Sequence, residues 1–225
     1  MYQRRTEFEC ARGLGRIGGM ALKAALFDMD GTIWDNPVDW AKVRAELGLG
    51  VDGRPIAHHL ARLPPEERAR GERILHAYEA RGVADGRPCP GARQLIDFLH
   101  GRGVACVLVT NNSRQSAMGV LRRHPLLFDR VFTREDIPMK PDPRAFLIPL
   151  SELGVPPQEA CVVGDSHLDL IAASRASVAE IILVSPRDWM RPLFPPGARF
   201  REVTDLYAAR DVLAELLTPG KESGD

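Results

Sequence analysis

Short apolar runs alternate along most of the chain with segments in which apolar residues recur at helical spacing. Four short apolar runs end at polar residues or glycine, and the last three are rich in β-branched residues, a pattern typical of buried strands in a parallel sheet. They span residues 22–27, 104–109, 160–163 and 181–184. The shorter run at residues 131–132 is a weaker candidate for a further strand.

Helical patterns lie between the predicted strands. They cover residues 92–100, 113–123, 143–153 and 168–174. Because strand and helix alternate, the pattern predicts an α/β fold, with a Rossmann-like, doubly wound and mostly parallel sheet. Open sheets of this kind bind ligands at the carboxyl ends of their strands.

The interval between the first and second predicted strands breaks this alternation. It contains helical patterns at residues 38–47, 56–63 and 65–81 and few strand signals. We therefore expect a small helical cap at residues 37–87, inserted into a core made of residues 21–36 and 88–217. Residues 1–20 are expected to form a flexible tail and residues 218–225 a disordered one, because neither has a sustained apolar period.

Composition limits the classes of partner. Thirty basic residues balance thirty acidic ones among 225, so no long-range field favours nucleic acid or an anionic membrane. No apolar stretch approaches the roughly 20 residues that span a bilayer, and the first twenty residues lack the apolar core of a signal peptide. Four cysteines without CxxC spacing favour a cytoplasmic location with reduced thiols. A monomer and a homodimer both stay open.

The first candidate site follows the first predicted strand directly. Asp28 and Asp30 stand two residues apart, and Gly31 releases the chain into a turn. Such a pair can hold Mg²⁺ and keep one oxygen for nucleophilic attack. The alternative is an ordinary loop in which Asp and Gly only form a turn. An EF-hand is excluded, because its calcium loop needs glycine at the sixth position, whereas Gly31 is fourth from Asp28.

Three later segments carry complementary groups. Thr110 and Asn111 end the second strand and open a helix, where N–H groups favour an anion. Lys140 lies in a proline-rich loop, and Asp165 and Asp169 begin a helix after another strand and glycine. Each has an ordinary alternative: a helix cap, an exposed lysine, or an N-cap with a first-turn acid. Together they compose a phosphate site.

These four segments, in this order, resemble the four motifs of the haloacid dehalogenase superfamily, over roughly residues 22–185. The helical insert resembles the cap of phosphoglycolate-phosphatase-like members, although it is shorter. The resemblance implies that Asp28 is the nucleophile and that Asp30 is the general acid and base. It also implies that Mg²⁺ is held by Asp28, Asp165 and the backbone carbonyl of Asp30.

The remaining motif residues have implied roles around the phosphoryl group. Thr110, Asn111 and Lys140 would bind it, and Asp169 would orient Lys140 or a metal-bound water. The implied activity is hydrolysis of a small phosphorylated metabolite of the phosphoglycolate or sugar phosphate type, through a phosphoryl-aspartate. A phosphomutase of the same fold and an inactive binding module are the alternatives. Asp30 disfavours dehalogenation, because dehalogenases of the superfamily lack this aspartate.

Side chains near the insert are candidates for specificity. Those that could meet an anionic substrate tail are Arg44, Arg54, His58, His59, Arg62 and Arg81. The three tryptophans are expected to be packing residues at the boundary of core and cap, at positions Trp34, Trp40 and Trp189. His167 follows Asp165 closely but is left out of the predicted metal site.

Overall fold

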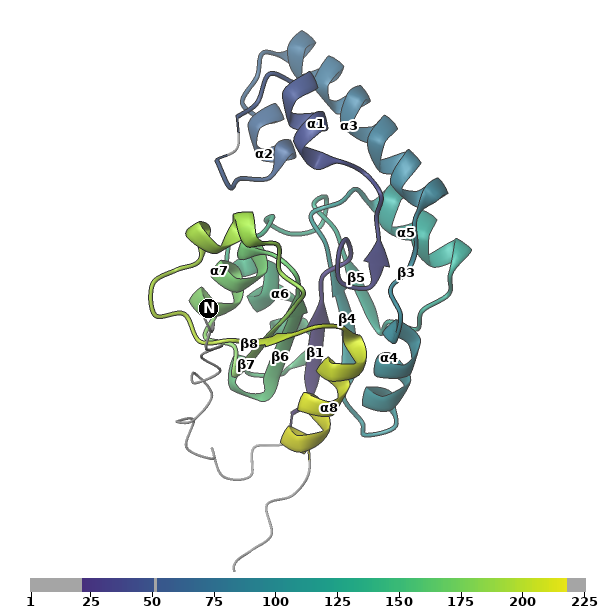
Figure 1. Ribbon diagram of the computed structural model, residues 1–225, viewed down its shortest axis with the longest axis vertical. Coiled ribbons are helices and arrows are strands. Elements are labelled where there is room, and N and C mark those ends of the chain that lie inside the picture. The colour runs from purple at the N-terminus through teal and green to yellow at the C-terminus, as the bar shows by residue number, and fades with distance from the viewer. Residues whose placement is uncertain (1–21, 51, 218–225) are drawn as a thin grey trace, which may run out of the picture.

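A six-stranded parallel sheet forms the centre of the protein (Figure 1). The computed structural model describes residues 22–50 and 52–217, so the predicted tails at residues 1–20 and 218–225 lie outside this part of the chain. The strand order is β5-β4-β1-β6-β7-β8. The strands are β1 (Ala24–Phe27), β4 (Ala105–Val109), β5 (Arg130–Phe132), β6 (Ala160–Gly164), β7 (Glu180–Val184) and β8 (Arg201–Val203). The predicted α/β fold is confirmed.

Helices cover both faces of the sheet because successive strand residues point to opposite sides. Ala25 and Phe27 pack with α4, α5 and α8 on one face, whereas Ala24 and Leu26 pack with α6 and α7 on the other. All four side chains are fully buried. These helices are α4 (Ala92–His100), α5 (Arg114–Arg123), α6 (Arg144–Leu153), α7 (His167–Arg175) and α8 (Leu206–Leu217).

A helical insert follows the first strand and lies over one end of the sheet, at the top of Figure 1. It contains α1 (Trp40–Glu46), α2 (Ile56–Leu60) and α3 (Pro65–Asp85). The two segments that join it to the sheet pair as an antiparallel ribbon, β2 (Trp34–Asp35) with β3 (Arg87–Pro88). The insert has a small apolar core of its own, made by Val43, Ile56, Leu60 and Leu75.

Several elements of the structure were not predicted from the sequence. The β2–β3 ribbon has two residues in each strand, too few for a periodic signal. β8 is an edge strand with two charged residues among its three. α8 was also missed, although it buries Leu206, Ala209 and Leu213 at helical spacing. Two 3-10 helices, η1 (Pro157–Glu159) and η2 (Asp188–Leu193), complete the described elements.

Among the residues with described positions, no helix has both the length and the apolarity needed to cross a bilayer.

Candidate active site

The carboxyl ends of three neighbouring strands bring predicted site residues together. β1 ends directly before Asp28, β4 before Thr110 and β6 before Asp165. Because these strands are adjacent and parallel, their ends meet at one edge of the sheet. Lys140 reaches the same edge from the loop between β5 and α6. All four side chains line a cavity of about 230 Å³, whose other wall comes largely from the helical insert.

Lys140 and Asp28 form a buried ion pair at the base of this cavity. The Lys140 ammonium donates hydrogen bonds to Asp28 Oδ1, to Asp169 Oδ1 at 2.7 Å and to the Val109 carbonyl at 3.0 Å. Burial lowers the pKa of Lys140, but Asp169 and Asp28 outweigh this effect and raise it above its ordinary value. Lys140 is therefore a fixed positive charge, and in the described part of the chain Asp28 Oδ2 has no hydrogen bond.

Burial and neighbouring charges also act on Asp28. Burial raises the pKa of Asp28 to about 7, the Lys140 ammonium opposes this rise, and the Asp169 carboxylate adds to it. The carboxylate is thus in a site where negative charge is incompletely compensated. A group with additional positive charge would stabilise its ionised form.

Asp165 lies against the turn after β1. A Cβ atom on Gly31 would lie 2.1 Å from Asp165 Oδ2, and Gly31 has a left-handed φ of +82°. Only glycine avoids both the collision and the backbone strain at this position. Burial, Asp28 and Asp169 raise the pKa of Asp165 well above its ordinary value.

The carboxylates of Asp28, Asp165 and Asp169 form a cluster in which one oxygen atom from each lies within 4.8 Å of the other two. Carboxylate oxygens are the preferred ligands of hard divalent cations such as Mg²⁺ and Ca²⁺. The raised pKa values of Asp28 and Asp165 arise partly from repulsion inside this cluster, and a bound cation would relieve that repulsion. The cluster therefore fits a divalent-cation site.

Asp169 uses its carboxylate mainly to hold Lys140. Its Oδ1 accepts the hydrogen bond from Lys140, and its Oδ2 accepts from the Ser166 hydroxyl at 2.5 Å and the Ser166 backbone N–H at 3.2 Å. The Ser166 interaction also caps the N-terminus of α7. Of the two partners that the resemblance implied for Asp169, Lys140 or a metal-bound water, this arrangement places Lys140 in contact.

Thr110 and Asn111 lie together but use their side chains differently. Thr110 Oγ1 accepts a hydrogen bond from the Asn112 backbone N–H at 3.1 Å, so its own proton can be donated to a ligand. The Asn111 amide instead pairs with the backbone of Lys140, at 3.0 Å to the carbonyl and 2.8 Å to the N–H. The side chain of Asn111 is therefore occupied, and only its backbone N–H remains for the phosphate contact that the resemblance implied.

Asp30 has a partner that was not predicted from the sequence. Asn112 Nδ2 donates to Asp30 Oδ2 at 2.8 Å, and Asp30 Oδ1 is buried without a hydrogen bond in the described structure. Burial raises the pKa of Asp30, and this effect outweighs the lowering by the amides of Asn112 and Asn36. A carboxyl with a raised pKa and one oxygen without a protein partner is suited to general acid catalysis.

Comparisons with known proteins agree with this geometry. The model of the haloacid dehalogenase-like hydrolase family matches residues 22–177. The chain belongs to this family. The predicted resemblance is therefore confirmed, and the six-stranded sheet with helices inserted after its first strand is the fold of a haloacid dehalogenase-like hydrolase.

Curated relatives of this hydrolase include phosphatases. It is 29% identical over 171 residues to a haloacid dehalogenase-like hydrolase domain-containing protein of Arabidopsis thaliana, covering 70% of this chain and 69% of the relative. It is also 29% identical over 232 residues to a phosphoglycolate phosphatase of Pseudomonas savastanoi pv. phaseolicola, covering 90% and 85% of the two chains.

Solved structures share its fold. A hydrolase from Pseudomonas syringae superposes with a TM-score of 0.69 at 23% identity, covering 87% of this chain and 100% of that one. The CbbY protein of Rhodobacter sphaeroides, solved in complex with xylulose-(1,5)bisphosphate, gives a TM-score of 0.63 at 23% identity, covering 82% and 95%.

The tryptophans of this hydrolase fall into two groups. Trp34 is 1% exposed and donates its indole N–H to the Gly82 carbonyl at 3.0 Å, so its predicted packing role is confirmed. Trp40 packs against the apolar core of the insert and also lines the cavity. Trp189 is 51% exposed and lines the cavity as well, so the packing prediction is wrong for this residue.

Most of the positive side chains predicted as specificity candidates do not line the cavity. Of the six predicted candidates, only Arg44 and Arg54 line it. The Arg44 guanidinium donates to the backbone carbonyls of Gly50, at 2.7 Å, and Arg54. His167 is not part of the carboxylate cluster and donates to the Gly53 carbonyl at 2.9 Å, which joins α7 to the insert.

Proposed function

We propose that this hydrolase is a Mg²⁺-dependent phosphatase that acts on a small phosphorylated metabolite through a phosphoryl group on Asp28. The observation that carries the proposal is the placement of Asp28, which Lys140 holds by one oxygen at the base of a cavity while its other oxygen makes no hydrogen bond in the described structure. Relatives named phosphoglycolate phosphatase, 26–29% identical, support a phosphatase. The sugar bisphosphate bound to CbbY supports a sugar phosphate as an alternative substrate.

In the first step, the free oxygen of Asp28 attacks the phosphorus atom of the substrate. The bond from phosphorus to the leaving oxygen breaks, and Asp30 donates its proton to that oxygen. Lys140 stays beside Asp28 and compensates negative charge on the transferring group, and the Thr110 hydroxyl and Asn111 N–H donate hydrogen bonds to it. Such charge compensation with in-line positioning is what phosphoryl transfer chiefly requires.

In the second step, water attacks the phosphorus atom of phosphoryl-Asp28. Asp30, now ionised, accepts a proton from this water, and the bond between phosphorus and the Asp28 oxygen breaks. Inorganic phosphate leaves and Asp28 returns to its carboxylate form. Asn112 holds Asp30 in place through both steps by its hydrogen bond to Oδ2.

Asp28, Asp165 and the backbone carbonyl of Asp30 would hold the Mg²⁺. When bound, this cation supplies positive charge that neutralises phosphoryl oxygens. Gly31 keeps Asp165 at its place by leaving room for its carboxylate. In this proposal residues 37–87 act as a cap that limits access of water to the site on the core of residues 21–36 and 88–217.

The test is phosphate release from a panel of phosphorylated metabolites, including phosphoglycolate and sugar phosphates, with Mg²⁺ and with a chelator. Asp28→Asn is expected to abolish release. Asp142→Asn is the matched control, because it makes the same change at a carboxylate outside the cavity, paired with Arg144 at 2.7 Å. Intact-mass spectrometry of quenched reactions should detect the phosphorylated protein in the wild type.

Either of two results would count against the proposal. Normal turnover of Asp28→Asn would remove Asp28 as nucleophile. Transfer of the phosphoryl group to a second hydroxyl of the substrate, without phosphate release, would make the protein a phosphomutase.

A further inference from the structure

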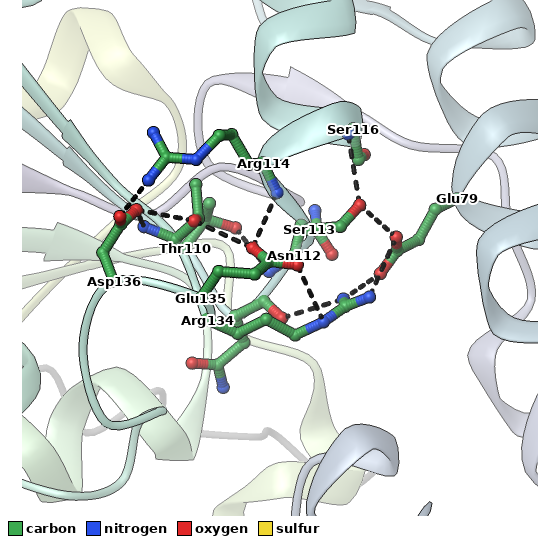
Figure 2. Close-up of polar contacts among 11 residues, drawn as sticks. Glu79, Thr110, Asn112, Ser113, Arg114, Ser116, Arg134, Glu135 and Asp136 are labelled. Atoms are coloured by element: carbon green, nitrogen blue, oxygen red, sulfur yellow. Dashed lines mark hydrogen bonds and ion pairs between the residues drawn. The ribbon is translucent and has the colours of Figure 1, made fainter. Parts of the chain in front are cut away.

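A buried ion pair joins the helical insert to the loop beside the phosphate site. Glu79 of α3 is 3% exposed, and the Arg134 side chain, from the turn after β5, is 11% exposed. The Arg134 guanidinium donates from one nitrogen to Glu79 Oε1 and from the other to Oε2 at 3.4 Å. The Ser113 hydroxyl donates to the same carboxylate at 2.6 Å. Figure 2 shows these three side chains converging between α3, the N-terminus of α5 and the turn.

Arg134 also holds the loop that follows β4. Its guanidinium donates to the Asn111 carbonyl at 3.4 Å, and its backbone N–H donates to the Asn112 carbonyl at 3.2 Å. The Asn111 carbonyl belongs to the same peptide group as the Asn112 N–H, which donates to Thr110 Oγ1 at 3.1 Å. A single planar peptide therefore links the guanidinium to the Thr110 hydroxyl.

The Asn112 side chain extends this connection to Asp30, to which it donates at 2.8 Å. Arg134 thus contacts the backbone carbonyls of Asn111 and Asn112, which flank the Asn112 N–H and side chain that hold Thr110 and Asp30. Both ions of the pair line the cavity that contains Asp28 and Lys140. A charged pair in such a place is retained only when its geometry and hydrogen bonds are good, because burial of the ions is unfavourable.

The docking of α3 on the core does not depend on this pair alone. Val83 of α3 packs closely on Gly119 of α5, where a Cβ would lie 3.0 Å from Val83 Cγ1. Arg123 of α5 donates to the Ala84 carbonyl at 3.0 Å. Loss of the ion pair should therefore leave α3 in contact with α5 and alter mainly the loop at Thr110–Asn112.

We propose that Arg134, held by Glu79, is a positioning residue that fixes the phosphate-binding loop and ties its geometry to the placement of the insert. The inference rests on the proposed phosphatase function, because it assigns the loop to phosphate binding. It deepens that function, since the insert then contributes to binding of the phosphoryl group itself as well as to selection of the leaving group. The effect of losing Arg134 should be the same for every substrate.

The test compares Arg134→Met, Arg134→Lys and Glu79→Gln with a control, Arg123→Met. The control removes another arginine contact between α5 and α3 that lies away from the loop. Binding of inorganic phosphate is measured by calorimetry with Mg²⁺ present, and kcat and KM are measured for phosphoglycolate and for para-nitrophenyl phosphate. Inorganic phosphate has no leaving group, so its affinity reports on the loop directly.

We expect Arg134→Met to weaken phosphate binding at least tenfold and to lower kcat/KM by a similar factor on both esters. Arg134→Lys keeps the positive charge but loses the two-pronged guanidinium, so it should recover part of the lost phosphate affinity and kcat/KM. The values for Glu79→Gln should fall between those of Arg134→Lys and the wild type. Arg123→Met should keep wild-type kinetics. The lysine and glutamine variants keep the test open if Arg134→Met does not fold.

Two outcomes would overturn the inference. One is phosphate affinity within twofold of the wild type in all three variants of the pair. The other is a loss in Arg123→Met equal to that in Arg134→Met, which would mean that docking of α3 alone matters. Wild-type protein that binds phosphate but hydrolyses no ester would contradict the proposed phosphatase, and the binding series would still decide the role of Arg134.

Discussion

Gly31→Ala tests whether the turn after β1 sets the position of Asp165. Gly31 has a φ of +82°, and an added Cβ would lie 2.1 Å from Asp165 Oδ2. The substitution therefore introduces backbone strain and a collision with a carboxylate of the proposed metal site. We expect it to lower both the stability of the protein and its Mg²⁺-dependent turnover.

The two effects have different sizes and different readouts. A left-handed backbone at alanine lowers the free energy of unfolding by about 1–2 kcal/mol. Ordinary van der Waals contact begins at 3.4 Å, so the Asp165 oxygen must move by more than about 1 Å to relieve the collision. Displacement of a catalytic group by about 1 Å lowers the rate by roughly 100-fold.

Urea unfolding and steady-state kinetics at several Mg²⁺ concentrations separate these effects. The matched control is Gly103→Ala, because Gly103 has a φ of +72° and no atom within 4 Å of the added Cβ. It should lose similar stability and keep wild-type turnover. Equal kinetics of the two variants would refute the reasoning, because the collision with Asp165 would then have no consequence.

Three further predictions concern charge. Lys140→Met should lower the free energy of unfolding by about 3–5 kcal/mol in urea titrations, because it leaves buried carboxylates without their counter-ion; an unchanged midpoint would contradict this. Mg²⁺ at about 100 times its dissociation constant should stabilise the wild type by about 2.7 kcal/mol in thermal unfolding, and Asp165→Asn should remove most of that shift. Burial raises the pKa of Asp129, but the Cys106 N–H and His100 outweigh it and hold that pKa below its ordinary value. A carboxyl whose pKa is lower in the folded protein than in the unfolded chain stabilises the fold only above its unfolded-state pKa. Asp129→Asn should therefore lower the free energy of unfolding by at most about 1 kcal/mol near pH 7. The difference from the wild type should shrink below about pH 4, and a difference independent of pH would contradict the assignment.

The sequence predicted the main strands and helices because their apolar patterns are regular. The predicted strand at residues 104–109 is β4 from Ala105, and the predicted helix at residues 92–100 is α4. In contrast, the β2–β3 ribbon consists of two-residue strands with Trp, Asp, Arg and Pro. Such strands form because the chain leaves and re-enters the core at one place. That proximity is set by the tertiary structure and not by the local sequence.

The site was predictable where each residue directly follows a strand. Asp28, Thr110 and Asp165 are adjacent because parallel strands end at one edge, and strand order brings β1 between β4 and β6. The partner of Asp30 was not predictable in the same way. Asn112 lies 82 residues away, and only the packing of β1 beside β4 brings its amide to the carboxylate.

The sequence by itself determined the α/β alternation, the helical insert and the set of acidic, hydroxyl and ammonium groups at strand ends. Those features are local, since they depend on spacing along a few residues. Only the tertiary structure decided that Asn111 holds the Lys140 backbone and that Glu79 meets Arg134. In the sequence Glu79 is one of many charged residues on a long helix. Its role follows from the face of α3 that packs on α5, where burial makes an ion pair necessary.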